Sequence, residues 1–265
     1  MATTATATTA DVGGRRSLTW LPGALGLVGL LLVWELLAHT VFSDSRAVPA
    51  PTAILRQLGR DGFAFYWPNT VTTVREAATG WLYGNAIAIA ASVVFVQIPI
   101  IERALLKVAL ASYCLPVIAI GPVLAIFYSG DTPKVILAAL SVIFTTLVST
   151  LVGLRSADRA SLDLIRAYGG GRWTQLRKVR LRASLPSMFA GLRIAAPAAM
   201  LGAIIGEYLG AESGLGVAMI NSQQSLAVER TWGIALVATA LSGLAYALTA
   251  LAGRLLAPWA PRGPR

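Results

Sequence analysis

Long apolar segments constrain this sequence more than any other feature. Residues Leu18–Ala38 contain one formal charge and are long enough, as a helix, to cross about 30 Å of hydrocarbon. Further candidate spans are Ala77–Ile98, Leu105–Tyr128, Val135–Leu154, Met188–Leu209 and Trp232–Leu256. In lipid a strand edge would leave backbone groups unpaired, so each span is expected to be a helix. The pattern predicts an all-α membrane protein with about six transmembrane helices, five being the alternative.

Composition agrees with this fold class. Only 13% of the 265 residues are charged and 56% are hydrophobic, whereas soluble domains carry about 25% charged residues. The Thr- and Ala-rich stretch 1–16 predicts a disordered cytoplasmic tail, 17–257 a transmembrane domain and 258–265 a second cytoplasmic tail. The first span follows two arginines, as in a signal peptide. No convincing A-x-A site follows it, which favours an uncleaved anchor.

The basic residues are concentrated in one connection. The net charge is +10, and the segment 155–193 holds nine basic residues against two acidic ones, a net charge of +7. Lys and Arg collect in cytoplasmic loops, so this connection is predicted to be cytoplasmic, with both termini on the same side. The connection 42–70, of mixed charge, is then an outside loop. Nucleic-acid binding is excluded because the basic residues follow membrane topology.

The cytoplasmic loop, 155–187, divides at the glycines 169–171. Before them, Leu162, Ile165 and Tyr168 recur at helical spacing, and Ser156 or Asp158 is the expected N-cap. After them comes a second apolar stripe, and Pro186 is expected near the start of the next membrane helix. Two interpretations remain open: a basic amphipathic hairpin lying on an anionic leaflet, or a docking helix for a cytoplasmic partner.

The loop resembles that of permease subunits in bacterial ABC importers, whose pattern is E-A-A, three residues, G, nine residues and I-x-L-P. Aligned on Gly169, the first element falls on 163–165 (Asp-Leu-Ile) and the last on 179–182 (Val-Arg-Leu-Arg). The segment 48–52 (Val-Pro-Ala-Pro-Thr) is similar to the P-x-P segment of sulfonate, taurine and nitrate permeases. Three further pieces follow in family order: 191–193 (Gly-Leu-Arg), 206–209 (Gly-Glu-Tyr-Leu) and 214–216 (Gly-Leu-Gly).

The resemblance implies a type I importer permease in the cell inner membrane, with a coupling helix between helices 4 and 5. It implies ABC ATPase subunits that carry ATP and Mg²⁺, an extracytoplasmic binding protein and a second permease copy. The short helix around Asp163–Trp173 would sit in a groove of the ATPase. The implied coupling residues are Asp163, Ile165, Ala167, Tyr168, Gly169, Gly171, Arg172 and Trp173. The implied cargo is a small organic anion (a sulfonate, taurine or a nitrate-like anion) or a vitamin precursor.

Polar residues within the predicted spans are candidates for the translocation path. Glu35 and Glu207 are the only acids expected well inside them. Glu207, near the outer end of its helix, either shapes a gate, pairs with an arginine, or simply reaches water. Asn85, Ser141 and Thr145 are the other path candidates, although Ser and Thr more often bond within or between helices.

Other functions need residues that the sequence lacks. The chain contains no G-x-x-x-x-G-K-[ST], so ATP hydrolysis belongs to a separate chain and the permease is not itself an enzyme. One histidine and one cysteine argue against an intramembrane enzyme and a cysteine-based zinc site. A stand-alone ion-coupled carrier remains the alternative. The segment 214–230 is expected to face outward, as a re-entrant or surface helix that meets the binding protein, or as an ordinary loop.

Overall fold

The computed structural model describes residues 21–42 and 47–259, and the regular elements of these residues are all helices. They form two compact units that meet between Ala53 and Ile54 in the sequence. The first unit contains α1 (Leu21–Thr40) and the first residues of α2 (Pro51–Gln97). The predicted all-α class is confirmed. The predicted tail 1–16 and residues 260–265 of the predicted tail 258–265 lie outside the described residues.

The α1 helix is apolar around its whole circumference, and most of its leucines are exposed, as a helix facing lipid requires. Its one carboxylate lies near its C-terminal end. Glu35 accepts hydrogen bonds from the Thr52 hydroxyl (2.6 Å) and backbone N–H (3.2 Å), and His39 Nε2 lies 3.1 Å from it. The polar groups of this unit therefore satisfy one another at one end of the helix.

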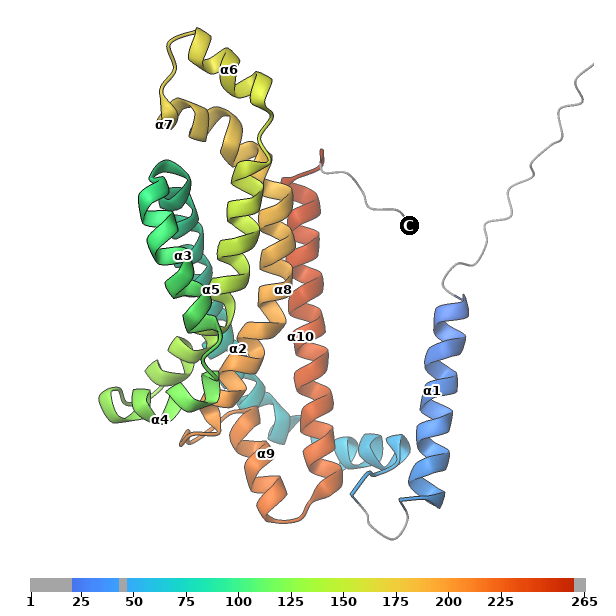
Figure 1. Ribbon diagram of the computed structural model, residues 1–265. Coiled ribbons are helices and arrows are strands. Elements are labelled where there is room, and N and C mark those ends of the chain that lie inside the picture. The colour runs from blue at the N-terminus through green and yellow to red at the C-terminus, as the bar shows by residue number, and fades with distance from the viewer. Residues whose placement is uncertain (1–20, 43–46, 260–265) are drawn as a thin grey trace, which may run out of the picture. The chain divides into compact units, whose positions relative to one another are not determined.

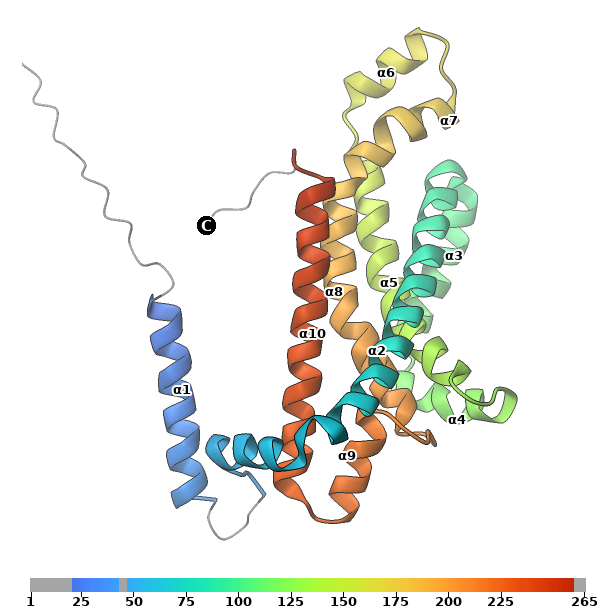
Figure 2. The same cartoon turned by 180° about the vertical axis from the view of Figure 1, so that it is seen from behind.

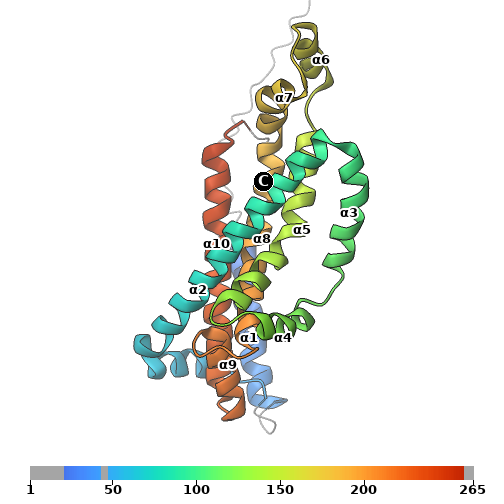
Figure 3. The same ribbon diagram turned by 90° about the vertical axis from the view of Figure 1, so that its left-hand side faces the viewer.

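The second unit is a bundle in which α5 and α8 pack along much of their length and α2 and α10 flank them (Figures 1 and 3). Its helices after α2 are α3 (Pro99–Tyr113), α4 (Val117–Phe127), α5 (Thr132–Arg155), α6 (Arg159–Ala167), α7 (Arg172–Gln175), the π-helix η1 (Leu176–Arg180), α8 (Leu181–Glu207), α9 (Leu215–Gln224) and α10 (Val228–Leu256). Figure 2 shows α2 bending at its N-terminal part, where Gly62 has a φ of 69°. The helical hairpin of α6 and α7 and the short α9 lie at opposite ends of the bundle.

Small residues let the central helices approach closely. A Cβ atom at Gly84 of α2 would lie 2.5 Å from Val142 Cγ2 of α5, and one at Gly206 of α8 would lie 2.7 Å from the Lys134 Cα. Dispersion contacts and close backbone approach hold membrane helices together, because lipid offers apolar groups as good a solvent as the helix partner does. The glycines therefore fix the position of α5 between α2 and α8.

The expected span Leu105–Tyr128 is wrong as a single helix. The chain forms α3 and α4 instead, and the break falls at 114–116, where Pro116 has no N–H and disfavours helical geometry in the residue before it. Both α2 and α5 end at the hairpin end of the bundle, so the chain does return between them, through two helices (Figure 3). Among the described residues, five helices are long and apolar enough to cross a membrane, and the count of six is not confirmed.

Two other boundaries differ from expectation. The predicted outside loop 42–70 is wrong beyond residue 50, because α2 begins at Pro51 and runs through this region. Pro186 does not open a membrane helix: the helical chain is continuous from Arg172 to Glu207, and Pro186 lies inside α8. Membrane helices tolerate internal prolines when neighbouring groups satisfy the freed carbonyl.

Candidate functional site

The hairpin projects beyond the ends of the membrane helices (Figure 1). Asp158 caps α6, accepting from the Ser161 backbone N–H and hydroxyl, both at 3.0 Å. These hydrogen bonds hold the pKa of Asp158 below its ordinary value. Of the two expected caps, Asp158 is the one that forms.

The glycines make the turn between the two arms. The Gly169 N–H donates to the Arg166 carbonyl and the Gly170 N–H to the Ile165 carbonyl, both at 2.8 Å. Gly169 has a φ of 76°, a conformation that glycine adopts without the cost paid by other residues. The expected short helix Asp163–Trp173 is therefore wrong as one element: α6 ends at Ala167, and a new helix begins after the turn.

The second arm continues into the membrane. The α7, η1 and α8 elements follow one another without a break, so a force on the turn acts directly on a membrane helix. Arg172 donates to the Gln97 carbonyl at the end of α2 (3.3 Å), and Arg180 donates to the Leu154 carbonyl at the end of α5 (3.0 Å). The hairpin is thus linked to three helices of the bundle.

The hairpin has one face toward the bundle and one away from it. Leu162 and Leu176 are buried at 7% and 1% exposure. Leu164, Tyr168 and Trp173 remain 58%, 86% and 60% exposed around the turn. The expected stripe of Leu162, Ile165 and Tyr168 therefore divides, because Tyr168 follows the end of α6 instead of extending its buried face. Exposed aromatic and aliphatic side chains near one turn are typical of a protein-binding surface.

A second polar site lies at the other end of the bundle. Glu207, at the end of α8, is 1% exposed and accepts from the Thr73 hydroxyl of α2 and from the Gly216 N–H of α9, both at 2.5 Å. Thr73 Oγ1 also accepts from the Leu215 N–H (2.9 Å), and Asn69 Oδ1 accepts from the Gly214 N–H (3.1 Å). The free N–H groups at the start of α9 are therefore satisfied by side chains from two other helices.

An ion pair lies beside this polar site, which joins α2, α8 and α9. Lys134 Nζ of α5 is 3.0 Å from Glu76 Oε1 of α2 and 3.0 Å from Asp131 Oδ1, and the side chains of Lys134 and Glu76 are 9% and 2% exposed. The Lys134 ammonium holds the pKa of Asp131 below its ordinary value. The statement that Glu35 and Glu207 are the only acids well inside the spans is therefore wrong, because Glu76 lies inside α2 and is only 2% exposed.

The comparisons with known proteins identify the family to which the chain belongs. The sequence profile of the "binding-protein-dependent transport system inner membrane component" family matches residues 84–260, two thirds of the chain. The chain belongs to this family of ABC importer permeases. A probable ABC transporter permease protein of Haemophilus influenzae is 30% identical over 82% of this chain and 89% of its own length.

Two further relatives carry substrate names. The riboflavin transport system permease protein RibX of Chloroflexus aurantiacus is 31% identical over 88% of each chain. A putative aliphatic sulfonates transport permease protein of Bacillus subtilis is 22% identical over 93% of this chain and 90% of its own. The resemblance to sulfonate-type permeases is confirmed, and the protein is a multi-pass inner-membrane protein.

In this permease, the four expected path residues occupy different surroundings. Asn85 is buried, donates to the Trp81 carbonyl (2.7 Å) and accepts from the Thr146 hydroxyl (2.5 Å), so it joins α2 to α5. Ser141 is half-buried and donates to the Leu137 carbonyl one turn earlier, and Thr145 is half-buried on the same helix. Glu207 pairs with no arginine among the described residues and does not reach water within the single chain. The path assignments stay predictions.

Sequence reasoning missed Thr73, Glu76 and Lys134, which belong to the polar site and the ion pair at the α9 end of the permease. The two ionisable residues stand immediately before the predicted spans that begin at Ala77 and Val135. One of these residues is acidic and the other basic, and each stands at the first edge of a span. Helices that enter the membrane side by side bring their first residues together, so this pattern could have indicated an ion pair between Glu76 and Lys134.

Proposed function

We propose that this permease forms the translocation pathway of an ATP-driven importer and works by alternating access. The hairpin would dock on a separate ABC ATPase subunit, and a second permease copy would complete the pathway. The single observation that carries the proposal is the exposure of Leu164, Tyr168 and Trp173 on either side of the turn in a hairpin continuous with α8. An ATPase covering these side chains would transmit its closure along that helix.

The proposed orientation places the hairpin and both termini in the cytoplasm, following the concentration of basic residues in 155–193. The opposite end, with α9, would then face outward. Its first turn is fixed by Glu207, Thr73 and Asn69, which gives an extracytoplasmic binding protein a stable surface to contact. ATP can shift the inward–outward equilibrium only through its different affinity for the two states of the assembly.

For the cargo we propose a small organic molecule, either a vitamin or vitamin precursor or an organic anion such as a sulfonate or taurine. The names of two relatives support these two classes, riboflavin in the one at 31% identity and aliphatic sulfonates in the one at 22%. The higher identity of the first favours the vitamin class. Ligand binding to the partner binding protein would decide between them.

The docking hypothesis is tested by co-purification of the full chain with an ABC ATPase of the same organism. The double variant Tyr168→Ala/Trp173→Ala should bind the ATPase at least about tenfold more weakly, because one hot-spot aromatic side chain at an interface costs about 2 kcal/mol or more when it is truncated. The matched control Tyr83→Ala/Trp67→Ala removes one tyrosine and one tryptophan, 63% and 53% exposed, away from the hairpin. Undiminished ATPase binding by the hairpin variant would refute this docking surface.

A further inference from the structure

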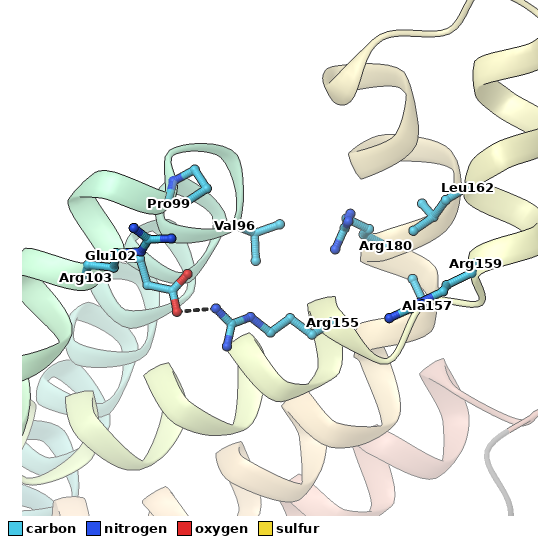
Figure 4. A pocket seen from close by; sticks show the side chains of 9 residues that line it. All are labelled: Val96, Pro99, Glu102, Arg103, Arg155, Ala157, Arg159, Leu162 and Arg180. Atoms are coloured by element: carbon cyan, nitrogen blue, oxygen red, sulfur yellow. Dashed lines mark hydrogen bonds and ion pairs between the residues drawn. The ribbon is translucent and has the colours of Figure 1, made fainter.

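A basic cavity separates the hairpin from the ends of the membrane helices. It has a volume of about 490 Å³ and is lined by the turn between α2 and α3, the connection after α5, the start of α6 and the π-helix (Figure 4). Four of the lining side chains are arginines, Arg103, Arg155, Arg159 and Arg180, and one is the acid Glu102. The lining therefore carries a net charge of +3 in a space large enough for a small ligand.

The one acid of the cavity is already engaged. Arg155 reaches across from the end of α5 and pairs with Glu102 of α3 (Figure 4). Among the described residues, no ion pair involves Arg103, Arg159 or Arg180. Three guanidinium groups thus face the cavity region without an internal counter-charge.

Arg180 is the most confined of the three. Within the described part of the chain its guanidinium makes one hydrogen bond, to the Leu154 carbonyl. The nearby charges that act on it are those of Arg166 and Arg155, which have the same sign. A guanidinium has five N–H donors in a planar fork suited to two oxygens of a phosphate or carboxylate. Held among like charges with most donors unused, it favours an anion in the cavity.

The position of the cavity indicates which anion. The C-terminal residues of α2 and α5, helices long enough to cross the membrane, form its floor, so in a bilayer the cavity would lie near the depth of the lipid headgroups. Val96, Pro99 and Leu162 add apolar surface beside the arginines. We propose that this cavity binds a phosphate group, supplied by an anionic phospholipid headgroup whose glycerol and first acyl carbons lie against the apolar side.

This site differs from a basic surface lying loosely on the membrane. A defined cavity predicts binding at one stoichiometric site that depends on particular arginines, and occupancy would join the α2–α3 turn to the hairpin. The inference rests on the proposed function only for the assignment of this end to the cytoplasmic leaflet. Lipid binding itself is measured on the permease alone, so loss of ATPase docking and loss of lipid binding are separate results.

The test is native mass spectrometry of the full chain in detergent, titrated with phosphatidylglycerol and, separately, with zwitterionic phosphatidylcholine. The variant Arg103→Gln/Arg159→Gln removes two exposed arginines for which the structure records no hydrogen bond. Each arginine beside an anionic headgroup contributes about fivefold in affinity, so the pair should weaken phosphatidylglycerol binding by roughly twentyfold or more. The matched control Arg177→Gln/Lys178→Gln removes two charges from the same loop outside the cavity and should bind as the wild type does.

A second arm distinguishes the source of the phosphate. If inorganic phosphate at millimolar concentration displaces phosphatidylglycerol from the wild type, the site recognises the phosphate group and free anions also enter it. If phosphatidylglycerol stays bound, the apolar wall contributes and the lipid is the ligand; both results support the site. Equal loss of binding in the two double variants, or no loss in either, would overturn it.

Discussion

The Glu207 carboxylate of α8 accepts a hydrogen bond from the Thr73 hydroxyl of α2 at 2.5 Å, although 134 residues separate them in the sequence. The same carboxylate accepts from the Gly216 N–H, so one side chain joins three helices. Since Glu207 is buried, none of these bonds is exchanged readily for water. One buried acid therefore ties α2, α8 and α9 together at the end of the bundle that carries α9.

Replacing this acid is expected to loosen that end. Glu207→Ala removes the acceptor for the Gly216 N–H, and a buried donor left without a partner costs about 1–3 kcal/mol. The Thr73 hydroxyl keeps a second acceptor, the Asn69 carbonyl at 3.1 Å. The melting temperature of the purified protein should fall. Glu212→Ala, which removes an exposed acid a few residues later, is the control and should melt as the wild type does. Equal melting temperatures for the two variants would contradict the role assigned to Glu207.

The Lys134–Glu76 pair predicts that removing one of the two charges costs more stability than removing both. Lys134→Met leaves the Glu76 carboxylate buried without its cation, a change that costs about 3–5 kcal/mol in buried pairs. Glu76→Gln/Lys134→Met removes both charges and should be closer to the wild type than Lys134→Met is. Thermal unfolding of the single and double variants gives the coupling free energy. Additive effects would show that the two charges do not interact.

The Asp158 cap predicts a pH-dependent hairpin. The folded-state pKa of Asp158 is below its ordinary value, so its stabilisation of α6 is fully present above that ordinary value and is lost as the pH falls through the lowered one. At neutral pH, Asp158→Ala should speed hydrogen exchange of the amides at the start of α6, Ser161 and Leu162, while Asp158→Asn, which can also cap, should have a smaller effect. Unchanged exchange in Asp158→Ala would show that the cap does not hold the helix.

Hydropathy predicted the interior of each span better than its edges. The centres of α5, α8 and α10 fall within predicted spans, because apolar runs of that length have few alternatives in lipid. The edges were missed where a charge interrupts the apolar pattern yet is buried against another helix, as at Glu76 and Lys134. Whether a charge at a span edge meets water or a partner depends on tertiary packing, which one sequence does not reveal.

The hairpin was predictable in outline from the three glycines and the flanking apolar residues. Its detailed geometry was not, because a helical period assigned Tyr168 to the face of Leu162. The structure ends α6 at Ala167 and leaves Tyr168 exposed. Glycine and proline show a similar limit of sequence-based prediction. Helix α2 bends at Gly62 and the helical chain breaks before Pro116, but Pro186 and Pro197 lie inside an uninterrupted helix. The presence of a proline therefore does not by itself predict a break.

The central claim, transport driven by an ATPase acting on the hairpin, is tested most directly by uptake into proteoliposomes containing the permease, its ATPase and its binding protein. The account predicts accumulation of the binding protein's ligand that requires ATP, resists a protonophore and is lost in Tyr168→Ala/Trp173→Ala but not in Tyr83→Ala/Trp67→Ala. Uptake by the permease alone, driven by a proton or sodium gradient without ATP, would contradict it and favour an ion-coupled carrier.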